Sequence, residues 1–109
     1  MITARFRRDR NQHLVSVQLT GHAGSGAYGY DIVCAATSTL ALNTVNSLEN
    51  LTSSQFDYAV DMENGGYLTI RLQDDKDEKS FLLMESFLLG MINLAENEPS
   101  FVSCYIIEE

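Results

Sequence analysis

The chain has 109 residues, with 15 acidic and 7 basic side chains and a formal net charge of −8. This length predicts one domain with a single core, and the acidic balance argues against direct binding to nucleic acid. The start of the chain lacks the pattern of a signal peptide, and the longest apolar stretch, residues 81–95, is too short to span a bilayer. We therefore expect a cytoplasmic protein without a membrane segment, whose two cysteines are thiols rather than a disulfide.

The basic residues are unevenly placed along the chain. Four of the seven (Arg5, Arg7, Arg8 and Arg10) stand within the first ten positions. The rest of the chain is therefore more acidic than the total suggests and would attract a basic partner, such as a ribosomal protein. The alternative is that this surface charge only keeps the protein in solution.

The first half of the sequence predicts a β-hairpin followed by a helix. Residues 2–9 and 13–20 alternate between apolar and polar side chains, and RDRNQ between them is typical of a turn. In the second strand the expected inward face carries Val15, Val17 and Leu19. From Asp31 to about Leu51 the apolar period becomes helical, and the Asp31 carboxylate is a suitable N-cap.

The second half repeats this order and adds one strand. Residues 55–63 alternate with Phe56, Tyr58, Val60 and Met62 on one face; NGG at 64–66 is a hairpin turn signal, and residues 67–72 return. Asp74 or Asp75 can cap a second helix that runs to about residue 97, and residues 101–108 form the last strand.

The resulting order, ββαββαβ, predicts an α+β two-layer sandwich with two helices packed on a mixed or mainly antiparallel sheet. The second helix is apolar on nearly every side between Phe81 and Leu94. Its own sheet covers only one face, so a homodimer is the simplest way to cover the other. The alternative is that the last strand or a loop covers it.

The stretch GHAGSGAYGYDIVCAA, residues 21–36, invites several interpretations. Residues 24–29 match the dinucleotide-binding pattern G-x-G-x-x-G, but the preceding strand pairs backward and the chain is too short for a doubly wound fold. The chain has four residues of the types that bind zinc: His13, His22, Cys34 and Cys104. No two of them stand at the short spacing that is typical of a pair of zinc ligands. We expect neither a nucleotide nor a metal, and no cofactor.

A third interpretation is structural, and a fourth is nucleophilic catalysis. In the structural interpretation Cys34 and its alanine neighbours only pack closely and the glycines only form a loop. In the catalytic one, a helix capped at Asp31 places Cys34 in its first turn, where the helix dipole favours a thiolate and free N–H groups can hold an oxyanion. His22 could fold back as the base, and the gap containing Gly24, Gly26 and Gly29 could move as a lid over bound peptide.

Two neighbours could assist or could be purely structural. Asp31 either orients His22 or only caps the helix, and both roles can coexist. Ser38 lies one helical turn after Cys34 on the same face, where its hydroxyl could hold substrate or tune the thiol. Otherwise Ser38 is a small polar residue bonded to its own helix backbone.

The segment Gly21-His22-Ala23, followed by residues 29–36 and Ser38, resembles the ribosomal-processing cysteine protease family called Prp. The resemblance covers the whole chain and implies a homodimeric cysteine endopeptidase. Members of that family remove a short N-terminal extension from the precursor of the twenty-seventh protein of the large ribosomal subunit. The resemblance implies His22 as base and Cys34 as nucleophile, with Gly21, Asp31 and Ser38 as site neighbours and a mobile loop after His22.

Two functions from other classes stay open at this point. One is a non-enzymatic ribosome-associated or assembly protein that binds a basic partner through its acidic surface. The other is a thiol redox sensor that uses Cys34 alone, or with Cys104 if the two lie close together.

Overall fold

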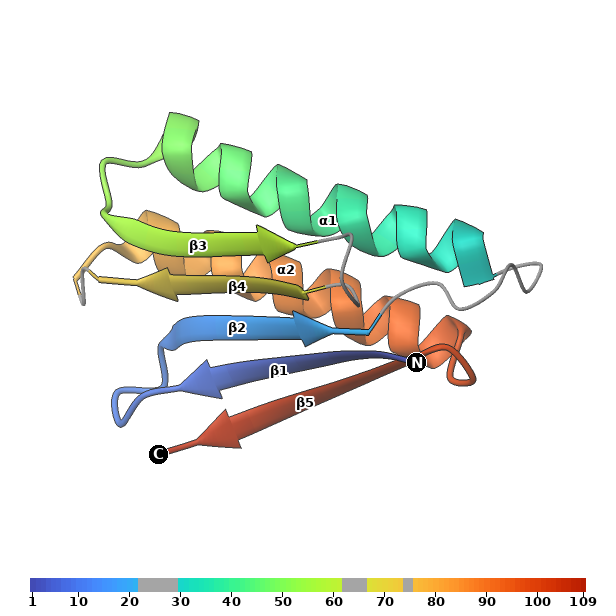
Figure 1. Ribbon diagram of the computed structural model, residues 1–109. Helices are drawn as coiled ribbons and strands as arrows, with labels where there is room; N and C mark the ends of the chain where they lie inside the picture. The colour runs from blue at the N-terminus through green and yellow to red at the C-terminus, as the bar shows by residue number, and fades with distance from the viewer. Residues whose placement is uncertain (22–29, 62–66, 74–75) are drawn as a thin grey trace.

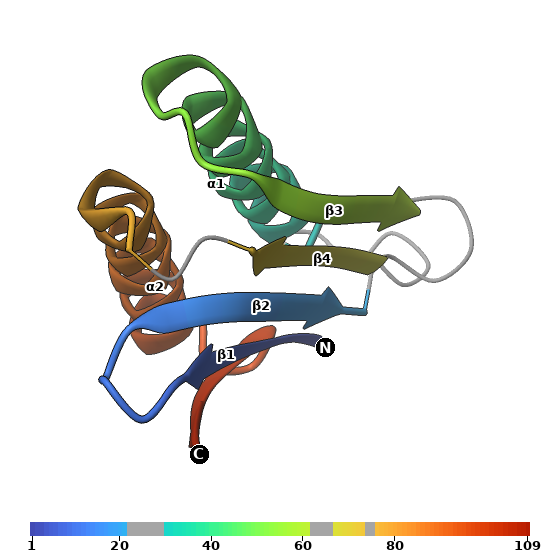
Figure 2. The ribbon, with the colours of Figure 1, turned by 90° about the vertical axis from the view of Figure 1, so that its left-hand side faces the viewer.

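The computed structural model describes residues 1–21, 30–61, 67–73 and 76–109, and within these ranges the chain forms five strands and two helices. The elements are β1 (Ile2–Arg8), β2 (Leu14–Thr20), α1 (Tyr30–Leu51), β3 (Phe56–Asp61), β4 (Tyr67–Leu72), α2 (Glu78–Asn97) and β5 (Val102–Glu108). Both helices lie on the same face of the sheet (Figures 1 and 2). The predicted order and the two-layer α+β architecture are confirmed.

The strands form one mixed sheet in the order β3-β4-β2-β1-β5. β1 runs antiparallel to β2, β2 to β4 and β4 to β3, whereas β1 and β5 run parallel. The last strand thus lies beside the first, and β3 and β5 form the two edges. In the described part of the chain no helix has the length and apolarity needed to cross a membrane.

A register irregularity in the first hairpin changes which side chains enter the core. Arg7 pairs with Ser16 while Arg8 pairs with Leu14, so Val15 is an extra residue on β2. Leu14 is therefore fully buried, and Val15 is only partly buried against the core. Val17 and Leu19 are buried as predicted, and Val15 packs against the core from a less buried position than Leu14.

The core lies between the sheet and the two helices. Phe6 of β1 meets Phe87 of α2 edge to face, with ring centroids 5.4 Å apart. The helices approach closely where Gly90 faces Leu40: a Cβ at position 90 would come within 3.1 Å of a Leu40 methyl group. Arg8 further ties β1 to α2, because its two guanidinium nitrogens donate to the two carboxylate oxygens of Glu85.

The N-terminus of α2 is capped by Asp77, not by Asp74 or Asp75. The Asp77 carboxylate accepts from the backbone N–H groups of Lys79 (3.0 Å) and Ser80 (3.3 Å), as an N-cap does. The buried Ser80 hydroxyl also donates to it. Residues 74–75 lie outside the described ranges. From the sequence alone, any of the three aspartates before this helix could be its N-cap. The backbone geometry determines which of them caps it.

Exposed apolar side chains among the described residues include two on β3 and two on α2. On β3, Tyr58 and Val60 are in register with buried Ile70 and Leu68, so they face the helix side as predicted, yet they are 49% and 40% exposed. Met62 lies outside the described residues. On α2, one face is buried while Leu82 and Leu89 are 68% and 60% exposed. Helix α2 therefore carries apolar side chains on a face that the sheet of its own chain does not cover.

Candidate active site

The chain leaves the sheet at Gly21, directly after β2. Gly21 has a backbone φ of 99°, a conformation that residues with a side chain rarely adopt. A Cβ at this position would overlap the carbonyl oxygen of Met1. Glycine at position 21 is therefore required both by backbone conformation and by space, and it sets the direction in which the chain continues to His22.

His22, Gly24, Gly26 and Gly29 fall within residues 22–29, which lie outside the described residues. The predictions that His22 is the base and that the glycine-rich segment acts as a lid therefore stay predictions. The end of β2 and the beginning of α1 lie at the same end of the sheet (Figure 1).

Helix α1 begins at Tyr30, one residue earlier than predicted. Asp31 is therefore the second helical residue and not the N-cap, and Cys34 is the fifth and lies in the second turn. The sequence suggested otherwise because an acidic residue is favourable both at the N-cap and within the first turn. The capping interpretation of Asp31 is thus corrected. Its role beside His22 is untested.

The position of Cys34 determines which N–H groups are available near its thiol. In a regular helix the Cys34 N–H pairs with the carbonyl of residue 30, so the unpaired donors belong to residues 30–32. Helical Cα–Cβ bonds tilt toward the N-terminus, which directs a side chain at position 34 back over this first turn. A thiol in the second turn can therefore still approach the free donors.

Cys34 is partly buried and packs against the hydrophobic core. Ser38, four residues on, is also partly buried. The hydroxyls of Thr37 and Thr39 donate to the carbonyls of Val33 and Ala35, each at 2.9 Å. No such bond ties the Ser38 hydroxyl to its own helix within the described residues, and its contact with substrate stays a prediction.

The other candidate ligands and thiols lie on separate elements. Cys104 is on β5, in register with Ala4, and its burial raises the pKa of the thiol. His13 follows the β1–β2 turn and stacks on Phe81, with ring centroids 4.0 Å apart. No group of three histidine, cysteine or acidic side chains converges in a metal-binding arrangement among the described residues.

A half-buried thiol near the start of a helix, at the end of the sheet where the chain leaves β2, defines a candidate nucleophile site of the cysteine protease class. The sequence matches the family model for cysteine protease Prp over residues 1–103. The chain belongs to this family and is a cysteine protease.

The relatives agree in sequence and in fold. The ribosomal processing cysteine protease Prp of Staphylococcus aureus is 33% identical over 96 residues, covering 88% of this chain and 90% of that protein. A protein of known structure from Streptococcus mutans is 52% identical, with a TM-score of 0.91 over 100% of this chain and 96% of its own. The S. aureus ribosomal processing protease Prp, solved with a covalently linked product peptide, is 30% identical, with a TM-score of 0.87 over 97% of this chain and 99% of its own.

The contact between Gly21 and Met1 could not be found from the sequence. A glycine after a strand is a signal for an unusual backbone angle, but the partner is 20 positions away in the chain. Only the pairing of β1 with β2 brings the two residues together.

Proposed function

We propose that this protein is a cytoplasmic endopeptidase that removes the N-terminal extension from the precursor of the twenty-seventh protein of the large ribosomal subunit. The observation that carries the proposal is the family membership over residues 1–103, together with the placement of Cys34 near the start of α1. The S. aureus relative holds a covalently linked product peptide, which is the species expected of a thiol nucleophile.

In the proposed mechanism His22 takes the proton from the Cys34 thiol, and the thiolate attacks the scissile carbonyl carbon. The N–H groups of residues 30–32 stabilise the oxyanion. When the carbon–nitrogen bond breaks, His22 returns the proton to the leaving amine, and the acyl group stays on Cys34 as a thioester. His22 then activates a water molecule that hydrolyses this thioester and regenerates the thiol.

The acidic chain suits such a substrate. The net charge is −8, and ribosomal proteins are basic, so long-range attraction favours encounter. Neither a cofactor nor nucleic acid has a part in the proposed reaction.

We also propose that the protein works as a homodimer. Leu82 and Leu89 lie two helical turns apart on α2 and are 68% and 60% exposed, and a second copy of this apolar face would cover them.

The direct test is mass spectrometry of the full-length precursor after incubation with wild-type protein, Cys34→Ala or His22→Ala. We expect the wild type to shorten the precursor at one bond and Cys34→Ala to leave it intact. His22→Ala should be slower by about 10²–10⁴-fold, the usual contribution of a general base.

Cleavage by Cys34→Ala at the wild-type rate would refute the mechanism. A precursor that binds the wild type tightly but is never cut would instead favour the non-enzymatic binding protein.

A further inference from the structure

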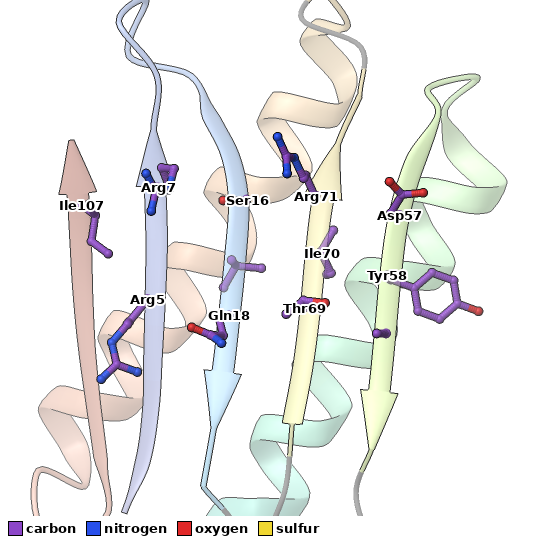
Figure 3. A pocket seen from close by; sticks show the side chains of 12 residues that line it. Arg5, Arg7, Ser16, Gln18, Asp57, Tyr58, Thr69, Ile70, Arg71 and Ile107 are labelled. Carbon is purple, nitrogen blue, oxygen red and sulfur yellow. The ribbon is translucent and has the colours of Figure 1, made fainter. Parts of the chain in front are cut away.

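The sheet face opposite the helices carries a hollow that the cysteine protease site does not use. No helix covers this face in either ribbon view (Figures 1 and 2). The hollow is lined by residues from all five strands, and the close view shows arginines on β1 and β4 (Figure 3). The charged and polar residues that line it include Arg5, Arg7, Ser16, Gln18, Asp57, Thr69 and Arg71.

The strand register places these side chains in two neighbouring rows. Arg7 is opposite Ser16, which in turn is opposite Arg71, so the two arginines stand on either side of a short side chain. Neighbouring strands lie about 4.8 Å apart, so the Arg7 and Arg71 backbones are separated by about 10 Å. In the adjacent row Arg5 is opposite Gln18, and Gln18 is opposite Thr69. Three guanidinium groups, three neutral polar groups and the Asp57 carboxylate therefore surround one space.

The charges of these arginines are weakly compensated. The Arg71 side chain is exposed, and its guanidinium group makes no hydrogen bond or ion pair with another described residue. The Asp57 carboxylate, opposite Arg71 on β3, is the nearest negative charge in register with it, and one of its oxygens also accepts from the Gln73 amide at 2.6 Å. Arg7 approaches Glu109 at 3.8 Å with both side chains about half exposed, a pair that contributes little. The Arg5 guanidinium donates a long bond of 3.4 Å to the Thr20 hydroxyl.

This arrangement is unusual in a chain with a net charge of −8. Three of the seven basic residues share this one face, on strands that are distant in sequence. Guanidinium groups bind carboxylates with paired, charge-assisted hydrogen bonds. Hydroxyl and amide groups of Ser16, Gln18 and Thr69 can add donors between them.

We propose that this sheet face is a docking surface for an acidic segment of a partner protein, whose carboxylates lie between Arg5, Arg7 and Arg71. Exposed Tyr105 and Ile107 of β5 are in register with Arg5 and Arg7 and would contact apolar residues of the same segment. A nucleic acid is disfavoured because the cationic area is confined to one hollow that also holds the Asp57 carboxylate, with Glu109 near Arg7. Duplexes and single strands are bound by longer basic surfaces.

The surface is independent of the proposed protease reaction. The arginines lie on the outer face of the sheet, whereas Cys34 is on a helix that packs against the inner face. A basic substrate would not be attracted to it, so its partner is distinct from the substrate.

The test uses the full chain and a short fluorescein-labelled peptide that alternates glutamate with leucine. Fluorescence anisotropy measures its affinity for the wild type, Arg71→Gln, and Arg10→Gln. Arg10 is the matched control because it is exposed in the turn after β1, away from the hollow. We expect Arg71→Gln to weaken binding by about threefold to tenfold at low salt, the range for one charge-assisted contact at an exposed site, and Arg10→Gln to leave it unchanged.

Two further measurements locate the site and exclude the alternatives. Amide chemical shifts of the isotope-labelled protein should change in β1, β2 and β4 and not around Cys34 when the peptide is added. A glutamine version of the peptide should not bind, and a single-stranded oligonucleotide should bind more weakly than the acidic peptide. Equal affinity of Arg71→Gln and the wild type, absence of binding, or tighter binding of the oligonucleotide would each overturn the proposal. Failure of precursor cleavage would leave it untouched.

Discussion

Gly21 and Met1 lie so close that the Met1 carbonyl oxygen occupies the space of a side chain at position 21. This contact joins the first residue of the chain to the point where the chain leaves β2 toward His22. It involves backbone atoms, which cannot rotate away as the end of a flexible side chain can.

Replacement of Gly21 with alanine should therefore destabilise the protein and reduce its activity. The left-handed φ and the backbone overlap together predict a loss of about 2–3 kcal/mol in the free energy of unfolding. Urea denaturation measures this loss. Precursor cleavage under conditions where the variant is folded measures the loss of activity.

Gly90→Ala is the matched control for a glycine in a crowded place. A Cβ there would meet only the Leu40 side chain, at 3.1 Å, and Leu40 can change rotamer. Alanine is also favoured over glycine inside a helix by about 1 kcal/mol. We expect a change in unfolding free energy smaller than about 1 kcal/mol. If Gly21→Ala proved as mild as Gly90→Ala, the backbone contact would not constrain the site.

Cys34 should be required for cleavage and Cys104 should not. Cys34→Ala should abolish peptide cleavage, and Cys104→Ala should retain it, although both side chains pack against the core. Each substitution removes one partly buried sulfur, so similar and modest losses of stability are expected, about 1 kcal/mol. Thermal unfolding and cleavage assays on the two variants compare these effects. Loss of cleavage in Cys104→Ala with an unchanged melting temperature would contradict the assignment.

Alkylation should reveal the buried environment of Cys104. Burial disfavours its thiolate and raises the pKa of the Cys104 thiol above the ordinary value. In Cys34→Ala protein, iodoacetamide should therefore modify Cys104 slowly at neutral pH and faster only as the pH rises beyond the usual range of a cysteine. Mass spectrometry at several pH values gives the rates. A short peptide with the same local sequence serves as the unburied reference.

The raised pKa of the Cys104 thiol also predicts how the stability of the protein changes with pH. The folded-state pKa of Cys104 lies above its unfolded value, so its contribution is fully present below the unfolded pKa and lost as pH rises through the folded one. Wild-type protein should therefore lose slightly more stability than Cys104→Ala on going from neutral to alkaline pH. Urea denaturation at both pH values compares them. An equal loss in the two proteins would contradict the burial of this thiol.

Glu85→Gln should weaken the attachment of β1 to α2. Arg8 donates to both oxygens of Glu85, and this hydrogen bonding raises the pKa of the Arg8 guanidinium. The Arg8 side chain is 18% exposed and that of Glu85 is 42% exposed, so the pair is worth more than a surface ion pair and less than a buried one. We expect a loss of about 1–2 kcal/mol by urea denaturation. Arg7→Gln, which breaks the exposed contact with Glu109, should cost less than about 0.5 kcal/mol.

Leu89→Glu should dissociate the proposed homodimer. A carboxylate on the exposed apolar face of α2 would be desolvated by a second copy, whereas Leu51→Glu at the end of α1 changes a residue of similar exposure on the other helix. Light scattering coupled to size exclusion gives the mass of each variant. A dimer that persists in Leu89→Glu would place the interface elsewhere.

Much of this protein follows from local sequence patterns. Two alternating segments, a helical period and a hairpin signal are short-range features, so the element order and the α+β class could be predicted from them. The motif from Gly21 to Ser38 was sufficient to identify the family, because several residue types recur at fixed spacing. The end of α2 before Pro99 was equally local, since proline lacks the N–H that continues a helix.

The tertiary structure decided what depends on distant contacts and on backbone geometry. The bulge that buries Leu14 more fully than Val15 depends on the register with β1, and the choice of Asp77 as cap depends on where the backbone enters α2. The contact of Gly21 with Met1 and the gathering of Arg5, Arg7 and Arg71 on one face require strand pairings that no local pattern contains. Local periodicity specifies which side of an element is apolar, whereas the sheet order specifies which residues meet.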